Sequence, residues 1–171
     1  METKIITLKP PYQAKMVECM LQMYQRSMGD TASHEEWLRT SVPDFEKSME
    51  KPGAVCIVQL NKGDGEIVGF AQGFKVPADQ ELGGFLGGYK MQSVIGDEYF
   101  FIERIAVHPD FQKCGTGEGL MARILGVQTC RQTLLWTKED GYMFRLMEKS
   151  GGEIIWHTRR IGVVMRIPTK K

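Results

Sequence analysis

A glycine-containing loop is the stretch of this sequence whose residue types and spacing could do chemistry. It reads Gln112-Lys113-Cys114-Gly115-Thr116-Gly117 and follows an apolar run that ends at His108-Pro109. Glycines carry no Cβ atom, so main-chain N–H groups beside them can approach a ligand closely. A helix predicted to begin at Gly117 adds the positive end of its dipole. The pattern therefore predicts an anion site, with a phosphate as the natural ligand.

Two other phosphate-binding loops and one plain alternative compete with this interpretation. No Gly-Lys-Ser/Thr follows a four-residue gap, as a Walker loop requires, and Gly115-x-Gly117-x-Gly119 is one residue short of a dinucleotide fingerprint. The plain alternative is a tight turn between a strand and a helix that binds nothing. The ligand-binding interpretation is favoured because several features agree along the same segment.

Two elements must position this loop. Aromatic and β-branched residues predict a strand over residues 99–107, and the proline at position 109 ends it because proline cannot extend a ladder. Residues 117–127 are predicted to be a helix from apolar residues at helical spacing: Leu120, Met121, Ile124 and Leu125.

The rest of the chain predicts further strands and helices. Strands are expected over residues 4–8, 54–60, 66–76, 133–137, 153–156 and 161–167, the last with the alternation of a half-buried strand. The glycines of residues 61–65 predict a hairpin with a bulged loop. Helices are expected over residues 12–27 and 142–150. Another helix is expected to begin after a capping box at Ser33, and a short separate helix is expected to begin at Asp44.

Length and composition limit the classes of protein. The 171 residues predict one domain, and 22 basic against 21 acidic residues give no long-range field, which disfavours nucleic-acid binding. No apolar run reaches the ~20 residues of a membrane span, and the first residues do not resemble a signal peptide, so a cytoplasmic location is expected. Four scattered cysteines and three histidines argue against a zinc site or a disulfide framework.

The loop has the motif Gln112-x-x-Gly115-x-Gly117 and follows Val107-His108-Pro109. In this context it resembles the acyl-CoA pyrophosphate loop of the GNAT N-acetyltransferase superfamily, whose pattern is Arg/Gln-x-x-Gly-x-Gly/Ala. The order of predicted elements resembles that family over essentially the full chain. The resemblance implies an α/β GNAT acyl-CoA N-acyltransferase fold, with a mixed, mostly antiparallel central sheet flanked by helices. It also implies direct transfer of an acetyl group from acetyl-CoA to a primary amine of a small molecule or protein, without a metal.

The resemblance assigns residues to acetyl-CoA. In the family the pantetheine arm bonds the central strand, here Ile105, Ala106 and Val107. The pyrophosphate lies on the loop and helix start, here Gln112, Lys113, Cys114, Gly115, Thr116, Gly117 and Glu118. Glu118 is expected to turn its side chain outward because a carboxylate repels a diphosphate, and Cys114 is expected to be a small-residue replacement, not a reactive thiol.

The catalytic side chains are less settled by the resemblance. Glu103 shares a strand face with Ile105 and Val107, so it is a candidate general base, although an ion pair with a neighbouring Arg or Lys is an equal alternative. Histone-type members carry the base two residues earlier, where this chain has Phe101. Many members also carry a tyrosine in the last helix that protonates the leaving thiolate, where this chain has Met147. Tyr142 is a weak substitute, because it lies five residues earlier and faces another side of that helix.

Three further expectations depend on the resemblance. Trp37 and Phe45 are candidates for acceptor contacts, with anchoring of the helices as the stronger interpretation. Residues 77–97 have no clear period and predict a segment that covers the acceptor site or pairs with another subunit, or equally a mobile flap. The departures at Phe101 and Met147 leave open a catalytically weak acyl-CoA-binding module that acts as a sensor or interaction protein. The resemblance also leaves a homodimer open.

Overall fold

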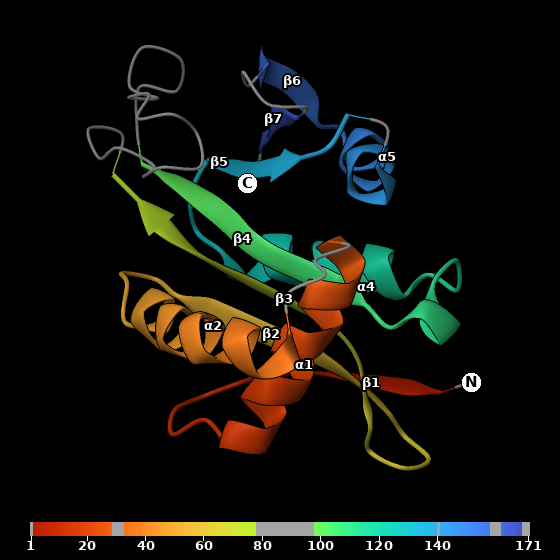
Figure 1. Ribbon diagram of the computed structural model, residues 1–171. Helices are drawn as coiled ribbons and strands as arrows, with labels where there is room; N and C mark the ends of the chain where they lie inside the picture. The colour runs from red at the N-terminus through yellow and green to blue at the C-terminus, as the bar shows by residue number, and fades with distance from the viewer. Residues whose placement is uncertain (1, 29–32, 78–97, 140, 158–161, 169–171) are drawn as a thin grey trace. The chain divides into compact units, whose positions relative to one another are not determined.

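Seven strands and four α-helices make up the described part of the chain, and the strand order is β1-β2-β3-β4-β5-β7-β6 (Figure 1). The structure is a computed structural model that describes residues 2–28, 33–77, 98–139, 141–157 and 162–168. The described pairings are antiparallel except for the parallel pair β4 (Tyr99–Val107) and β5 (Gln132–Thr137). The predicted α/β class with a mixed, mostly antiparallel sheet is confirmed. The chain divides into two compact units, residues 1–73 with 104–127 and residues 74–103 with 128–171.

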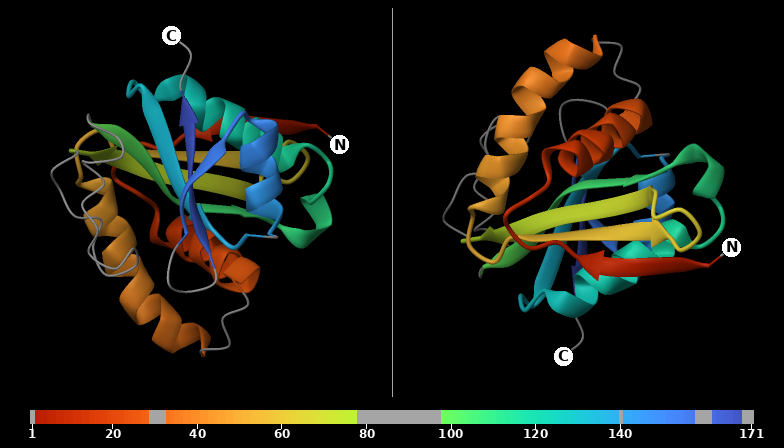
Figure 2. Two further views of the ribbon diagram at one scale, coloured as in Figure 1. Left: turned by 90° about the horizontal axis from the view of Figure 1, so that it is seen from above. Right: turned by 90° about the horizontal axis from the view of Figure 1, so that it is seen from below.

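The first unit contains strands β1 (Thr3–Thr7), β2 (Val55–Asn61) and most of β3 (Ile67–Val76), together with the end of β4. Its helices are α1 (Ala14–Met28), α2 (His34–Met49) and α4 (Thr116–Val127). Figure 2 shows α1 and α2 over one face of these strands and α4 over the other. The β2–β3 hairpin carries the expected irregularity, because its register shifts between Gln59 and Leu60.

Strand alternation explains which residues meet which helix. Val58 and Phe70 are cross-strand partners that belong to the core under α1 and α2, and Ala106 of β4 joins the same core. The neighbouring Gly69 faces α4 instead. The buried members of the core under α1 and α2 are Val17, Met20, Leu21, Met23, Phe45, Cys56, Val58, Phe70 and Ala106.

The prediction of a separate helix from Asp44 is wrong, because Asp44 lies inside α2, which is continuous through Pro43. Proline inside a helix removes one main-chain hydrogen bond and usually ends or kinks the helix. Here the residues on both sides of Pro43 bury apolar side chains in one core: Phe45 is fully buried, and Trp37 packs on Tyr24 with ring centroids 6.5 Å apart. Tertiary packing thus overrides the local break. The capping residue is as predicted, because Ser33 Oγ accepts a hydrogen bond from the Glu36 amide at 3.4 Å.

The second unit contains the first half of β4, β5, β6 (Glu153–His157), β7 (Val163–Pro168) and helix α5 (Tyr142–Lys149). Strand β7 pairs with both β5 and β6. The half-buried alternation predicted for residues 161–167 is wrong in part: Val163, Val164 and Met165 are consecutive and all buried, a pattern typical of an interior strand, and β7 lies between β5 and β6. Gly151 ends α5 with φ +81°, as the sequence predicts.

Several predicted boundaries are confirmed to within a residue or two. β4 has the predicted range, and α4 begins one residue before its predicted start at Gly117. Residues 77–97 are expected to cover the acceptor site or to pair with another subunit. Positions 78–97 of this segment lie outside the described residues. None of the described helices combines the length and the apolar character that a membrane span needs.

Candidate functional site

The end of β4 is fixed by a short network of hydrogen bonds. A 3₁₀ turn (Pro109–Phe111) follows His108, whose Nδ1 accepts a hydrogen bond from the Asp110 amide at 3.4 Å. The Gln112 side chain then returns to the strand, because its Nε2 donates to the Val107 carbonyl at 3.3 Å. The loop that follows therefore starts from a fixed point at the strand end.

The amide of Gln112 is not available to a ligand in this arrangement. It donates to the Pro109 carbonyl at 3.2 Å, which completes the 3₁₀ turn. Of the residues expected on the pyrophosphate, Gln112 therefore has its main-chain N–H engaged within the turn. Gln112 holds the loop instead, through one main-chain and one side-chain hydrogen bond.

The next five amides differ from that of Gln112. Within the described chain, the N–H groups of residues 113–117 have no main-chain acceptor, and the first helical bond of α4 runs from the Gly119 amide to the Gly115 carbonyl at 2.9 Å. Lys113 has φ 62° and Gly115 has φ +83°. A left-handed conformation is uncommon for a lysine, and such conformations concentrate at ligand-binding loops. The loop thus presents consecutive donors that the described part of the protein does not use.

The start of α4 reinforces this arrangement. The residue before the helix is Gly115, which has no side chain to cap the first amides, so the four orphan N–H groups of a helix start are left to other partners. The helix dipole adds about half a positive charge at that end. Glu118 is exposed, and so is Cys114. This end of α4 is suited to an anion.

Helix α4 lies very close to the sheet at this point. A Cβ atom on Gly69 of β3 would be 2.9 Å from Leu120 Cδ1 and 3.1 Å from the Ala106 carbonyl oxygen. Glycine at position 69 therefore allows the first turn of α4 to pack on β3 and the end of β4. That packing sets where the unused amides lie.

The strand residues Ile105, Ala106 and Val107 lead directly into the loop, and all three are buried. The parallel ladder of β4 with β5 consists of the pairs Phe100–Thr133, Phe101–Leu134 and Ile102–Leu135, and it ends before Glu103. Glu103 itself is half-buried and alternates with Arg104, whose Nη1 donates to Gln72 Oε1 at 3.0 Å. Ile105 and Val107 therefore lie on the same face of β4 as Glu103.

Tyr142, the other predicted catalytic candidate, belongs to the second unit, as Glu103 does. Tyr142 is the first residue of α5, and 44% of its surface is exposed. Met147, five residues later in the same helix, is fully buried. The two other aromatic candidates serve packing: Phe45 contacts Tyr12 edge-on at 5.8 Å, and Trp37 packs on Tyr24.

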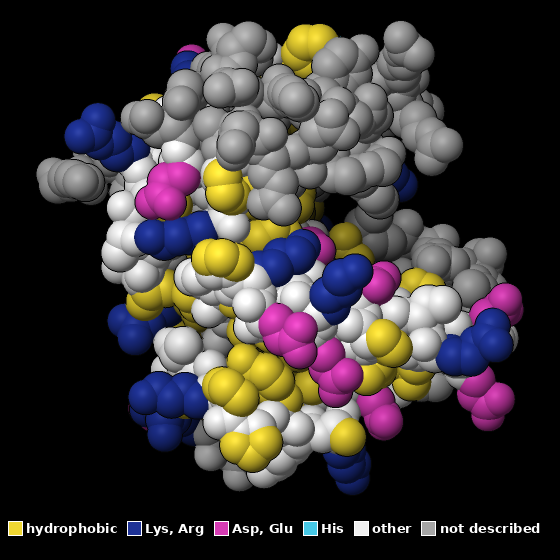
Figure 3. Space-filling view, turned by 90° about the vertical axis from the view of Figure 1, so that its left-hand side faces the viewer, with side chains coloured by type: hydrophobic (Ala, Val, Ile, Leu, Met, Phe, Trp, Pro, Cys, Tyr) yellow, Lys and Arg dark blue, Asp and Glu magenta, His cyan; other side chains and the backbone are white. Residues whose placement is uncertain are grey.

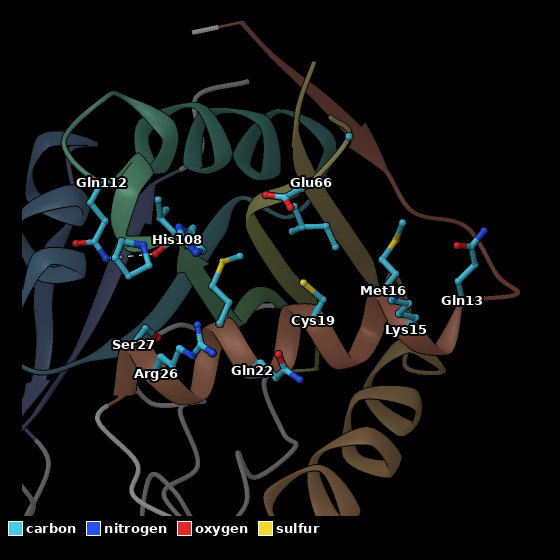
Figure 4. A pocket seen from close by; sticks show the side chains of 15 residues that line it. Gln13, Lys15, Met16, Cys19, Gln22, Arg26, Ser27, Glu66, His108 and Gln112 are labelled. Carbon is cyan, nitrogen blue, oxygen red and sulfur yellow. Dashed lines mark hydrogen bonds between the residues drawn. The ribbon is translucent and has the colours of Figure 1, made fainter. Parts of the chain in front are cut away.

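Sequence reasoning missed a groove that runs along α1 and reaches the loop (Figure 4). Its walls come from α1, from the start of β3 and from the end of β4, and it includes His108 and Gln112. Its volume is about 490 Å³. The recurrence of Lys15, Cys19, Gln22 and Arg26 along one face of α1 was a signal available in the sequence. The residues of β3 opposite that face could not be inferred from spacing.

The described residues carry no group of three or more His, Cys, Asp or Glu side chains that could hold a metal ion. All four cysteines are free. On the face drawn in Figure 3, basic and acidic side chains are interspersed over the described surface. The groove and the loop with its helix start are two features of the first unit that are suited to small ligands.

Comparison with known proteins gives a family. A family model described as the acetyltransferase (GNAT) family matches residues 17–143, which include β4, the loop and α4. Comparison with curated protein sequences gives no match.

Solved structures with the same fold cover nearly the whole chain. The crystal structure of PH1933 from Pyrococcus horikoshii OT3 is 22% identical with a TM-score of 0.73, over 99% of this chain and 100% of that one. The ribosomal-protein-S18-alanine N-acetyltransferase from Escherichia coli is 15% identical with a TM-score of 0.64, over 99% and 96%. Arabidopsis thaliana NAA60 in complex with a bisubstrate analogue is 14% identical with a TM-score of 0.65, over 96% and 98%. These likenesses show the fold.

Proposed function

Because the chain belongs to the acetyltransferase (GNAT) family, we propose that it transfers an acetyl group from acetyl-CoA directly to a primary amine of a small molecule or protein. The observation that carries the proposal is the set of unused amides of residues 113–117 at the uncapped start of α4. A diphosphate is a suitable partner for this set because its oxygens accept several main-chain hydrogen bonds and its charge is favourable at the helix dipole.

In this proposal the acyl carrier is held mostly by main-chain groups. The diphosphate is bound by the amides of Lys113, Cys114, Gly115, Thr116 and Gly117, while Gln112 holds the loop and Glu118 points into solvent. The pantetheine arm bonds the main chain of Ile105, Ala106 and Val107, beyond the end of the ladder with β5. The Val107 carbonyl already accepts one bond from Gln112, and its second lone pair remains for the arm.

The amine must lose a proton before it attacks the thioester. A lysine amine with pKa ~10.4 costs roughly 4–5 kcal/mol to deprotonate at pH 7, whereas an α-amine near ~8 costs about 1 kcal/mol. We assign Glu103 as the general base, directly or through one water, because its half-buried carboxylate is on the same strand as the proposed pantetheine contacts. The neutral nitrogen then bonds to the acetyl carbon as the C–S bond breaks. Glu103 keeps the first proton, and the second N–H proton, which is released as the amide forms, passes to the leaving sulfur.

Protonation of the leaving thiolate is less demanding than deprotonation of the amine. Met147 cannot donate a proton and is buried. We propose that Tyr142 or water protonates the sulfur, which is a tolerable leaving group because its thiol has a pKa of ~8.5. Loss of a general acid typically costs 10²–10⁴-fold, whereas positioning can supply ~7–11 kcal/mol, so a transferase without this tyrosine can still turn over.

A second candidate function is a catalytically weak acyl-CoA-binding module that acts as a sensor or interaction protein. The burial of Met147 at the position of the acid favours it. The unused amides of the loop are equally compatible with it, since both candidates bind the acyl carrier.

Thiol release separates the two candidates. The protein is incubated with acetyl-CoA and a panel of amines, and free thiol is measured for the unchanged chain and for Glu103→Gln. The transferase predicts turnover with at least one amine and a loss of about 10²-fold in the variant. Tight coenzyme A binding without turnover on any amine supports the binding module instead. A cytoplasmic location, a single domain and a homodimer remain predictions.

A further inference from the structure

The groove along α1 has the size of a ligand site. Its volume of about 490 Å³ falls within the 300–1,000 Å³ that is typical of small-molecule pockets. Figure 4 shows α1 along one wall, with Glu66 of the β2–β3 connection across from Cys19, and with His108 and Gln112 at one end. All of its lining residues belong to the unit of residues 1–73 and 104–127.

Three charged side chains line this groove without neutralising one another. Lys15 and Arg26 come from α1, and Glu66 comes from the opposite wall. In the part of the chain that the structure describes, none of these three side chains takes part in an ion pair or a hydrogen bond. Isolated surface charges are ordinary, but opposite charges on facing walls of one concavity leave a pattern that a ligand can complement.

Cys19 also lines the groove, and all three charges influence its thiol. Burial raises the pKa of Cys19, the Glu66 carboxylate raises it further, and Arg26 and Lys15 lower it, in that order of size. All three charges therefore bear on the middle of the groove. The wall between them is apolar, with Met16, Met23 and Ile67.

We infer that the groove along α1 binds a zwitterion of net negative charge, which places one ammonium group at Glu66 and two carboxylates at Arg26 and Lys15. The guanidinium of Arg26 is suited to a carboxylate because its N–H groups match two oxygens at once. An acidic amino acid and a short acidic peptide share this chemistry. Lys15 and Arg26 are eleven positions apart, or about 16 Å along the helix axis, so their long side chains must turn toward each other to contact the two carboxylates of one acidic residue.

Other charge classes fit less well. A dication meets two cationic side chains and a single carboxylate. A dianion without an ammonium leaves Glu66 facing like charge. The inference concerns binding alone and does not depend on acetyl transfer.

Calorimetry on the full chain at low salt tests this inference with four probes: L-glutamate, the tripeptide Ala-Ala-Glu, glutarate and cadaverine. L-Glutamate and glutarate differ in the ammonium group, and the tripeptide places its ammonium group two residues farther from the two carboxylates. We expect saturable binding of L-glutamate or of Ala-Ala-Glu that is about tenfold tighter than that of glutarate, because only these two probes carry the ammonium group that pairs with Glu66. No saturable heat from either amino dicarboxylate, or equal binding of glutarate, overturns the inference.

Matched variants locate the site. Arg26→Gln and Glu66→Gln are each expected to weaken binding by about tenfold. Arg39→Gln on α2 and Glu18→Gln on α1 make the same charge changes at exposed positions outside the groove and are expected to leave it unchanged. Circular dichroism confirms that each variant is folded. Equal affinity in the groove variants and the unchanged chain contradicts the inference.

Discussion

Two left-handed residues, Lys113 and Gly115, shape the loop after β4. Glycine tolerates φ +83° without steric cost, whereas a lysine in this region costs of order 1 kcal/mol, which the hydrogen bonds of Gln112 to the Pro109 and Val107 carbonyls help to offset. At this scale backbone conformation matters more than side-chain chemistry, because the main chain supplies the proposed ligand contacts.

Two glycines, Gly115 in the loop and Gly126 in α4, allow a matched test of that conformation. A Cβ atom added to either Gly115 or Gly126 would have no neighbouring atom within 4 Å, but only Gly115 has positive φ. We therefore expect Gly115→Ala to lower the free energy of unfolding by about 1 kcal/mol, and Gly126→Ala in α4 to raise it by about 0.5 kcal/mol. Urea unfolding of both variants measures the two signs. A stabilising Gly115→Ala contradicts the proposed strain.

Glu103 gives a second prediction at the residue scale. If its carboxylate removes the proton of the amine, Glu103→Gln lowers kcat/KM by about 10²-fold or more for an amine of high pKa, and by less for an amine near ~8. Coenzyme A affinity serves as the control and is expected to stay unchanged. Equal losses for both amines indicate a structural role, such as an ion pair.

Among the elements, β4 and α4 were predictable from the sequence and α2 was not. The strand ends at His108-Pro109 for a local reason, and the apolar positions of α4 recur at helical spacing, so both signals lie within the segment itself. Pro43 gave an equally local signal for a helix break, but burial of Phe45 and the packing of Trp37 hold α2 together. Local patterns fail where long-range packing decides.

The close approach of α4 to β3 yields a prediction for these elements. The added methyl group of Gly69→Ala meets Leu120 Cδ1 at 2.9 Å, the Ala106 carbonyl oxygen at 3.1 Å and Thr116 Cγ2 at 3.3 Å, so the buried Leu120 side chain must move, and we expect α4 to move with it. We expect a loss of about 1–3 kcal/mol in unfolding free energy and weaker coenzyme A binding, because the loop amides move with the helix start. Gly63→Ala is the control, since the nearest atom to its added methyl group lies 3.8 Å away. If Gly69→Ala is less stable but binds coenzyme A with unchanged affinity, the packing of α4 on β3 does not position the loop amides, and the prediction is contradicted.

At the scale of the whole molecule, the sequence supplied the order of elements and the loop, while the groove and the role of Gln112 required coordinates. Lys15 and Arg26 share a helix face that periodicity reveals, but Glu66 is forty positions from Arg26 and reaches the same groove only through the fold. The hydrogen bond from the Gln112 amide to the Pro109 carbonyl likewise depends on a 3₁₀ turn that no sequence motif predicts.

The pH dependence of the unfolding free energy in alkaline solution tests the burial of cysteine and tyrosine side chains. Burial raises the pKa of the Cys56 thiol from 9.0 to about 12, and burial also raises the pKa values of Tyr12, Cys19, Tyr99 and Cys130. The unfolded chain releases these protons first, so stability is complete below pH 9 and falls as the pH rises toward 12. For Cys56 alone we expect about 2 kcal/mol less unfolding free energy at pH 10.5 than at pH 9.

Urea unfolding with a reductant present measures this slope. Cys56→Ala removes the thiol and is expected to reduce the pH dependence, apart from a constant loss due to the smaller side chain. The same slope in the variant and in the unchanged chain shows that other groups cause the alkaline loss.

Calorimetric titration of the full chain with coenzyme A tests the central claim most directly. We predict saturable binding with one site per chain, and a clear loss of affinity in Gly115→Ala while Gly126→Ala binds as the unchanged chain does. A folded protein that gives no heat up to millimolar coenzyme A contradicts the claim that the amides of residues 113–117 hold a diphosphate.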